Sequence, residues 1–275
     1  MANAPGSDEL PVAQPQNYYT EPEFIDVNGL ETAYRRQGQG EPVLFLHGAG
    51  LTRMWLPMYA RCAKNVDFIA PEHPGFGATA RPNWLSGFDD LVVHYDELLA
   101  LLGVDELHVI GYSLGGWIAA EFAAYYPRRL KSLTLITPIG LRVDDPGPDA
   151  FKFNPDELID HLFNDKSVIP SVVADSEDFE EMVQGHAEAA TLAKLIWAPR
   201  YNLALERRLR RVTCPSLVVK AENDRLVSGT MADRYTELLP NSQTVTIAET
   251  GHALIAERPD ETADAITVFI TGAQQ

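Results

Sequence analysis

Short apolar runs recur along most of this 275-residue chain, and longer segments of mixed polarity separate them. Near-continuous apolar character over about 4–8 residues is typical of parallel strands that are covered on both faces. Segments with helical patterning, notably residues 88–102 and 229–239, fall between these runs. The alternation predicts an α/β fold with a doubly wound sheet. The expected strands are residues 43–46, 66–70, 107–110, 132–136, 216–219 and 244–247.

A hairpin is expected before the first of these strands. Residues 24–27 and 30–34 are strand-like and flank the pair Asn28-Gly29. An Asn-Gly pair between two such runs is a strong signal for a tight β-turn. With this hairpin, the expected sheet has eight strands, mostly parallel and flanked by helices.

The strand pattern stops after residue 136 and resumes near residue 212. Residues 138–211 contain several prolines among helix-like stretches, of which 179–197 is the longest. Such a length is too great for an ordinary loop. We therefore expect an inserted helical cap at 138–211, which divides the core into residues 21–137 and 212–275. A cap above the site would exclude water and shape the substrate pocket.

The first 20 residues contain Pro5, Pro11 and Pro15 but no Lys or Arg, and no long apolar run. This composition predicts a flexible N-terminal tail and does not resemble a secretory signal. No other stretch approaches the roughly 20 apolar residues that a membrane-spanning helix needs. A cytoplasmic protein, monomeric or homodimeric and without membrane partners, is expected.

The formal net charge is −17, which weighs against nucleic acid as a partner because phosphate contacts need Lys and Arg. The content of 45% hydrophobic and 22% charged residues is typical of a globular domain. Cys62 and Cys214 form no motif and are expected to be free thiols. No dinucleotide fingerprint or metal-ligand spacing is evident. We expect no cofactor, no metal and a small-molecule substrate.

A serine between two glycines follows the apolar run 107–110. Gly111 and Gly115 stand two residues before and two residues after Ser113, and a helix-compatible segment follows. A turn that carries a nucleophile from a strand into a helix is sharp, and small residues at these two places let the backbones pass closely. The pattern predicts that Ser113 is a nucleophile on a strand-to-helix turn.

An acid and a histidine follow the last two expected strands. Asp224 comes after the strand 216–219, and His252 comes after the strand 244–247. The chain order Ser, Asp, His is the order expected after such a serine turn. Loops after parallel strands meet at one edge of the sheet, where ligands bind. We expect His252 to act as the base and Asp224 to orient it, with Glu222 as an alternative acid.

The chain resembles enzymes of the α/β-hydrolase fold from about residue 24 to its end. The resemblance rests on His47-Gly48-Ala49-Gly50, His73-Pro74-Gly75-Phe76-Gly77, Gly111-Tyr112-Ser113-Leu114-Gly115-Gly116, Asp224-Arg225-Leu226-Val227 and Gly251-His252. It implies a Ser-His-Asp triad and an oxyanion hole made by the backbone amides of Ala49 and Leu114. For His47 itself we expect a structural role.

The resemblance limits the chemistry without choosing a substrate. Ser113 stands where haloalkane dehalogenases and epoxide hydrolases carry aspartate, which excludes their mechanisms. We favour a serine hydrolase that cleaves a small, fairly apolar carboxylic ester or lactone through an acyl-enzyme. Hydrolases of carbon–carbon bonds in aromatic ring-cleavage pathways are an alternative. Those enzymes usually have asparagine at the position of Tyr112 and tryptophan at that of Ala253.

Two further alternatives remain open. One is a cofactor-free perhydrolase, and the other is a hydrolase-fold ligand receptor with incidental turnover, which would not need all three of Ser113, Asp224 and His252. Candidate pocket residues are Trp55, Trp117, Trp197 and Arg200. A cap arginine such as Arg200 can pair with a substrate carboxylate.

Overall fold

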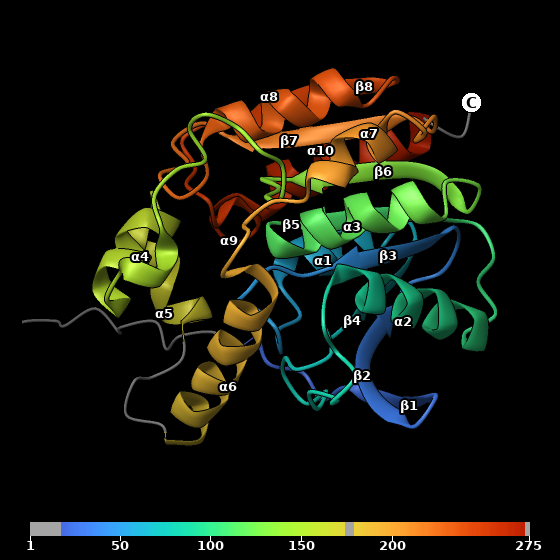
Figure 1. Ribbon diagram of the computed structural model, residues 1–275, viewed down its shortest axis with the longest axis horizontal. Coiled ribbons are helices and arrows are strands. Elements are labelled where there is room, and N and C mark those ends of the chain that lie inside the picture. Colours follow the sequence, from blue (N-terminus) through green and yellow to red (C-terminus); the bar gives the residue numbers. More distant parts are fainter. Residues whose placement is uncertain (1–17, 174–178, 273–275) are drawn as a thin grey trace, which may run out of the picture.

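A mostly parallel sheet of eight strands forms the centre of the computed structural model, which describes residues 18–173 and 179–272 (Figure 1). The strand order is β1-β2-β4-β3-β5-β6-β7-β8. The pairs β1–β2 and β2–β4 are antiparallel, and the remaining pairs are parallel. Each expected strand is present, and the predicted sheet is confirmed. The strands are β1 (Glu23–Val27), β2 (Leu30–Gln37), β3 (Pro42–Leu46), β4 (Asp67–Pro71), β5 (Leu107–Tyr112), β6 (Leu130–Ile136), β7 (Ser216–Ala221) and β8 (Ser242–Ile247).

Helices cover both faces of this sheet. On one face lie α2 (Phe88–Leu101), α3 (Leu114–Tyr125) and α8 (Gly229–Leu238), and on the other α1 (Pro57–Cys62), α9 (Leu254–Glu257) and α10 (Pro259–Gly272). Strand β3 is apolar throughout because its side chains are buried on both faces of the sheet. Leu44 and Leu46 belong to the first apolar cluster, Val43 and Phe45 belong to the second, and all four are fully buried.

The described residues between β6 and β7 are largely helical, and this segment is called the insertion; the cap bounds 138–211 stay a prediction. It contains α4 (Pro155–Leu162), α5 (Ile169–Val172), α6 (Phe179–Ile196) and α7 (Leu203–Leu209), with 3₁₀ turns at Ala150–Lys152 and Lys166–Val168. In Figure 1, α4, α5 and α6 lie beyond one end of the sheet. Helix α7 instead packs against α3. The insertion therefore has a part beyond the sheet and a part within the helical layer.

The expected N-terminal tail is only partly described, because residues 1–17 lie outside the described residues. Residues 18–20, the described end of this tail, bond to the body of the domain, and flexibility of the tail stays a prediction. The carbonyl of Tyr18 accepts from the Trp55 amide at 2.8 Å, and Tyr19 forms a β-bridge with Met54. The carbonyl of Thr20 accepts from the Arg35 guanidinium.

Within residues 18–173 and 179–272, the helices are all too short or too polar to cross a membrane.

Candidate active site

Ser113 occupies the turn between β5 and α3, and its backbone is strained. Its φ of +53° lies in the left-handed region that residues with side chains rarely adopt. Close backbone approach explains the flanking glycines. A Cβ on Gly111 would lie 2.2 Å from the carbonyl oxygen of Gly115, and a Cβ on Gly115 would lie 2.0 Å from that of Leu46. The turn thus brings the serine to the carboxyl end of the central strands.

A continuous chain of hydrogen bonds joins Ser113 to two other loops. His252 Nε2 lies 2.8 Å from Ser113 Oγ, and His252 Nδ1 lies 2.8 Å from Asp224 Oδ2. A carboxylate can only accept, so Nδ1 carries the ring proton and Nε2 is free to accept from the serine hydroxyl. His252 is 1% exposed. This order of donors and acceptors suits removal of the serine proton.

Backbone amides fix the Asp224 carboxylate. Its Oδ1 accepts from the amides of Leu226 at 2.9 Å and Val227 at 2.8 Å, which leaves Oδ2 for the histidine. The alternative acid, Glu222, points elsewhere, since its Oε2 accepts from the amide of Glu249 at 2.9 Å. The structure therefore places Asp224, and not Glu222, against His252.

Tyr112 ties the serine turn to the histidine loop. Its hydroxyl donates to the carbonyl oxygen of His252 at 3.0 Å, and the two ring centres are 5.5 Å apart. Burial holds the pKa of Tyr112 well above its ordinary value, so the hydroxyl stays protonated and remains a donor. The sequence pattern did not predict this role for the residue that precedes Ser113.

The glycine-rich loop after β3 lies against the serine turn. A Cβ on Gly48 would lie 3.1 Å from Ser113 Cβ and 2.8 Å from the Tyr112 ring. Ala49 is the next residue of this loop and is exposed. Leu114 is the first residue of α3, where backbone N–H groups have no acceptor within the helix. Leu114 thus directly follows Ser113 and Ala49 follows the glycine that lies against it, while the oxyanion hole stays a prediction.

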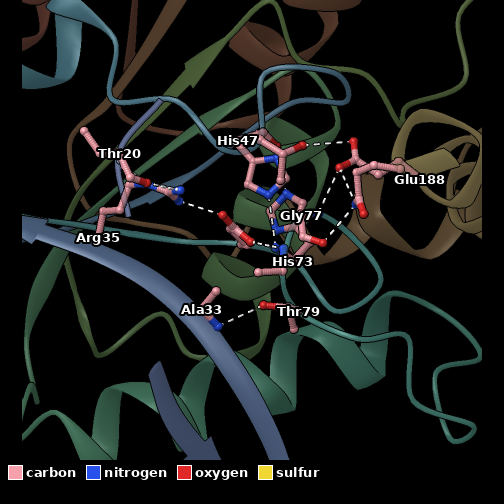
Figure 2. Close-up of polar contacts among 12 residues, drawn as sticks. Thr20, Ala33, Arg35, His47, His73, Gly77, Thr79 and Glu188 are labelled. Atoms are coloured by element: carbon pink, nitrogen blue, oxygen red, sulfur yellow. Dashed lines mark hydrogen bonds and ion pairs between the residues drawn. The ribbon is translucent and has the colours of Figure 1, made fainter. Parts of the chain in front are cut away.

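Two stacked histidines support the glycine-rich loop (Figure 2). Burial lowers the pKa of His47 to about 4, and burial together with His47 lowers that of His73 well below its ordinary value, so both rings are neutral. The His73 amide donates to His47 Nε2 at 3.0 Å, so the His47 proton sits on Nδ1 and donates to the carbonyl of Gly48 at 2.6 Å. His73 Nε2 donates in turn to the carbonyl of His47 at 2.8 Å, and its Nδ1 contacts the Tyr95 hydroxyl.

Glu72, which precedes His73, is bound by protein groups. Its carboxylate pairs with Arg35, which Figure 2 labels, at 2.6 Å and accepts from the amide of Ala78. Among the described residues, no group of three or more His, Cys, Asp or Glu side chains is placed to hold a metal ion.

Helix α6 of the insertion is tied to the loops after β3 and β4. Glu188 accepts from the Thr52 hydroxyl at 3.0 Å and from the Gly77 amide at 2.8 Å (Figure 2). Gln184, one turn earlier, donates to the carbonyl of Gly77 at 2.9 Å. Because Thr52 follows the glycine-rich loop by two residues, these contacts link the insertion to that loop.

The four candidate pocket residues lie outside the hydrogen-bonded group. Trp55 packs edge-on against Tyr59 and Phe68, at 5.8 Å and 5.7 Å between ring centres. Trp117 stacks on Phe88 at 4.0 Å, and its indole nitrogen donates to Glu121 at 3.2 Å. These two residues are part of the apolar packing of the core.

The other two candidates lie near the surface of the insertion. Trp197 is 65% exposed, and its ring centre lies 5.1 Å from that of Phe151. Arg200 forms an ion pair with Asp149 at 3.1 Å. The Arg200 guanidinium is therefore paired within the protein, whereas recognition of a substrate carboxylate would need it free.

Three residues that contact the site were not predicted from the sequence: Tyr112, Glu188 and Glu257. Glu257 accepts from the Gly251 amide, next to His252, at 3.0 Å. An acid that directly follows the apolar segment 253–256 is an available signal for Glu257. For Glu188 no such signal exists, because its bonds to Thr52 and Gly77 join residues more than 100 positions apart in sequence.

Comparison with known proteins agrees with this architecture. Residues 43–265 match the model of the alpha/beta hydrolase family. Mouse (Mus musculus) monoacylglycerol lipase ABHD6 is 26% identical over 266 residues, which cover 86% of this chain and 77% of that protein. The 2-hydroxy-6-oxo-2,4-heptadienoate hydrolase of Pseudomonas putida is 26% identical over 246 residues, which cover 83% of this chain and 88% of that protein. The structure of a meta-cleavage product hydrolase from Pseudomonas fluorescens superposes with a TM-score of 0.76 at 23% identity. The superposition covers 92% of this chain and 98% of that protein. The last likeness shows the fold.

Proposed function

The chain belongs to the alpha/beta hydrolase family, and on that premise we propose that it is a serine hydrolase that cleaves a small, fairly apolar carboxylic ester or lactone. One observation carries the proposal: the hydrogen-bonded chain from Ser113 through His252 to Asp224, with 2.8 Å at each step. A serine hydroxyl is a weak nucleophile unless a base lies within hydrogen-bond distance. His252 Nε2 meets that requirement.

In the first half of the reaction, Ser113 Oγ attacks the carbonyl carbon while its proton passes to His252 Nε2. Asp224 stabilises the imidazolium that forms and keeps the ring in the tautomer described above. The amides that bind Asp224 Oδ1 hold the carboxylate in place during this step. The product of the attack is a tetrahedral intermediate with a negatively charged oxygen.

Two backbone amides are proposed to bind that oxygen. The Leu114 amide opens α3, and the Ala49 amide lies on the loop that His47 and His73 support. Preformed donors at the place where charge develops stabilise the transition state, and loss of one costs about 10²–10³-fold in rate. The neutral histidine pair thus contributes by fixing the loop that carries one donor.

Collapse of the intermediate completes the acyl transfer. His252 returns its proton to the alcohol oxygen as the carbon–oxygen bond breaks, and the acyl group stays on Ser113. For a lactone, the alcohol remains attached to that acyl group. Water then attacks the acyl-enzyme with His252 as the base again, and the acid is released.

The apolar packing of the insertion against the core supports an apolar, uncharged substrate. From the insertion, Leu192, Leu195 and Ile196 join the apolar cluster that contains Val227. On the opposite side, Phe163 joins the cluster that contains Leu51. Arg200, the candidate for recognising a substrate carboxylate, is already paired with Asp149. These features favour a neutral ester over a charged substrate.

A carbon–carbon bond hydrolase is the second candidate, and the similarity to the Pseudomonas putida heptadienoate hydrolase favours it. Such a reaction would use the same three side chains on a ketone. Against it stands Tyr112, whose hydroxyl is engaged with the His252 carbonyl in the place where those enzymes usually have asparagine.

The test is hydrolysis of p-nitrophenyl esters from acetate to octanoate by the wild type and by Ser113→Ala. We expect turnover by the wild type, a maximum at one chain length that reports the pocket size, and loss of turnover in the variant. A vinylogous 1,5-diketone dienoate, assayed in parallel, distinguishes the second candidate. Faster turnover of the dienoate than of every ester would replace the ester proposal with carbon–carbon hydrolysis.

A further inference from the structure

A short segment of the insertion passes between the loops that carry Asp224 and His252. This segment, the strap, consists of residues 162–165 at the end of α4. The carbonyl of Phe163 accepts from the Arg225 guanidinium at 2.7 Å. The carbonyl of Leu162 accepts from the Ala253 amide at 2.9 Å. The strap therefore touches the residue that follows Asp224 and the residue that follows His252.

Glu257 binds the strap to the other side of His252. Its side chain is buried, and one carboxylate oxygen, Oε1, accepts from the Gly251 amide at 3.0 Å. The other oxygen, Oε2, accepts from the amides of Asn164 at 3.2 Å and Asp165 at 2.7 Å. Hydrogen bonds to a charged acceptor are stronger than those between neutral groups. A single carboxylate thus joins the histidine loop to the strap.

The close approach of the strap explains the glycine before His252. A Cβ on Gly251 would lie 2.7 Å from the Asn164 amide nitrogen and from the Leu162 carbonyl oxygen, and 3.1 Å from Glu257 Oε1. Any side chain at this position would push the strap and the carboxylate away. The Gly-His pair is therefore a packing requirement of this junction.

Arg258, the residue after Glu257, pairs with two other carboxylates. Arg258 directs its guanidinium toward the carboxylates of Asp165 at 3.7 Å and Glu249 at 3.8 Å. The contacts of the Glu257 carboxylate described above are all with backbone amides. The Glu257 carboxylate therefore bonds to the backbone at Gly251 and in the strap.

Three anchors hold the backbone around His252. The Gly251 amide bonds to Glu257, the Ala253 amide bonds to Leu162, and the carbonyl of His252 itself bonds to Tyr112. The position of this backbone sets the position of the imidazole ring. The ring position in turn sets the distance of 2.8 Å from His252 Nε2 to Ser113 Oγ. Misplacement of a reacting group by about 1 Å costs about 10²-fold in rate.

We propose that Glu257 is a positioning residue for His252: its carboxylate fixes the histidine loop to the strap and so sets the ring against Ser113. The proposal rests on the proposed serine hydrolase activity. It assigns to the insertion, through the strap, a part in assembling the site in addition to covering it.

The test compares Glu257→Gln with Glu249→Gln. The first variant is isosteric, but its amide has one acceptor oxygen, so either the Gly251 amide or the strap amides face an NH₂ group. The control makes the same change three residues before His252, on a side chain that is 80% exposed. With the best p-nitrophenyl ester, we expect Glu257→Gln to lower kcat by about 10- to 100-fold with KM nearly unchanged. Glu249→Gln should keep the wild-type kcat.

Two more measurements separate positioning from a general structural effect. In a His252→Ala background, Glu257→Gln should cause no further loss of the residual rate. The far-downfield proton resonance of His252 Nδ1–H, which reports the bond to Asp224 without any turnover, should weaken in Glu257→Gln and persist in Glu249→Gln. If Glu257→Gln does not fold, Glu257→Asp, whose shorter side chain cannot span both partners, is measured in its place.

The outcomes are distinct. Wild-type kcat and an unchanged resonance in Glu257→Gln would overturn the proposal, and so would an equal loss in the His252→Ala background. If the wild type hydrolyses no ester, the proposed function fails, while the resonance still decides whether Glu257 positions His252.

Discussion

At the scale of single residues, two neutral histidines hold the glycine-rich loop beside Ser113. His47 and His73 exchange hydrogen bonds that require each ring to be in one tautomer. A second proton on His47 Nε2 would face the His73 amide and break this arrangement. The loop that carries Ala49 therefore depends on the histidines remaining uncharged.

Stability should consequently fall on acidification. Burial lowers the pKa of His47, His94 and His108 from 6.5 to about 4 each. Between these pH values the unfolded chain binds more protons than the folded one, so stability is full above about pH 6.5 and is lost as the pH falls toward 4. Each histidine accounts for about 2 kcal/mol between pH 7 and pH 5.

The His94→Gln variant tests this account, because Gln can still bond to Thr32, the neighbour of His94 at 3.4 Å. Urea unfolding at pH 7 and pH 5 should show a smaller loss of unfolding free energy in the variant, by about 2 kcal/mol. An identical loss in the two proteins would show that His94 is not responsible.

At the scale of elements, a few contacts between segments that are distant in sequence hold the insertion against the core. Helix α6 meets the core loops through Glu188, and the strap meets them through Phe163 and Leu162. These contacts all fall on loops that follow strands of the sheet. The insertion is therefore held at the edge where Ser113 lies.

Removing the Glu188 contacts should loosen α6 without unfolding the core. Glu188→Ala loses the bonds to Thr52 and Gly77, each worth about 1 kcal/mol. Amide hydrogen exchange at Gly77 and along α6 should speed up roughly tenfold, while β3 and β5 keep wild-type protection. The matched control is Glu188→Gln, which can accept from Gly77 and donate to Thr52. Equal exchange in Glu188→Ala and wild type would mean that other contacts hold α6.

Apolar runs predicted the strands and their order along the chain, because parallel strands buried on both faces require such runs wherever they occur. Val43 to Leu46 illustrate this, since successive side chains enter opposite clusters. The position of α7 against α3 was not predictable in this way. It depends on Arg208 and Asn202 reaching the buried Glu121, and local pattern carries no information on such pairs.

The molecule as a whole combines two apolar clusters, one on each face of the sheet, with polar loops that meet at a single edge. For the candidate site, chain order and the glycine pattern led to Ser113, Asp224 and His252, which the structure brings within hydrogen-bond distance. The residues that hold them, such as Tyr112 and Glu257, were not found. Tyr112 bonds to a residue 140 positions away in sequence, and Glu257 bonds to the strap, at least 92 positions away. Only the bond of Glu257 to Gly251 is local among these contacts.

The most direct test of the central claim is to trap the acyl-enzyme. The wild type is quenched during turnover of its best p-nitrophenyl ester, and intact-mass and peptide measurements locate the added group. We predict one acyl group per chain, on the peptide that contains Ser113, and a fall in kcat of at least about 10⁴-fold in Ser113→Ala. Wild-type turnover without an adduct on Ser113, together with a Ser113→Ala variant that keeps its rate, would contradict the account.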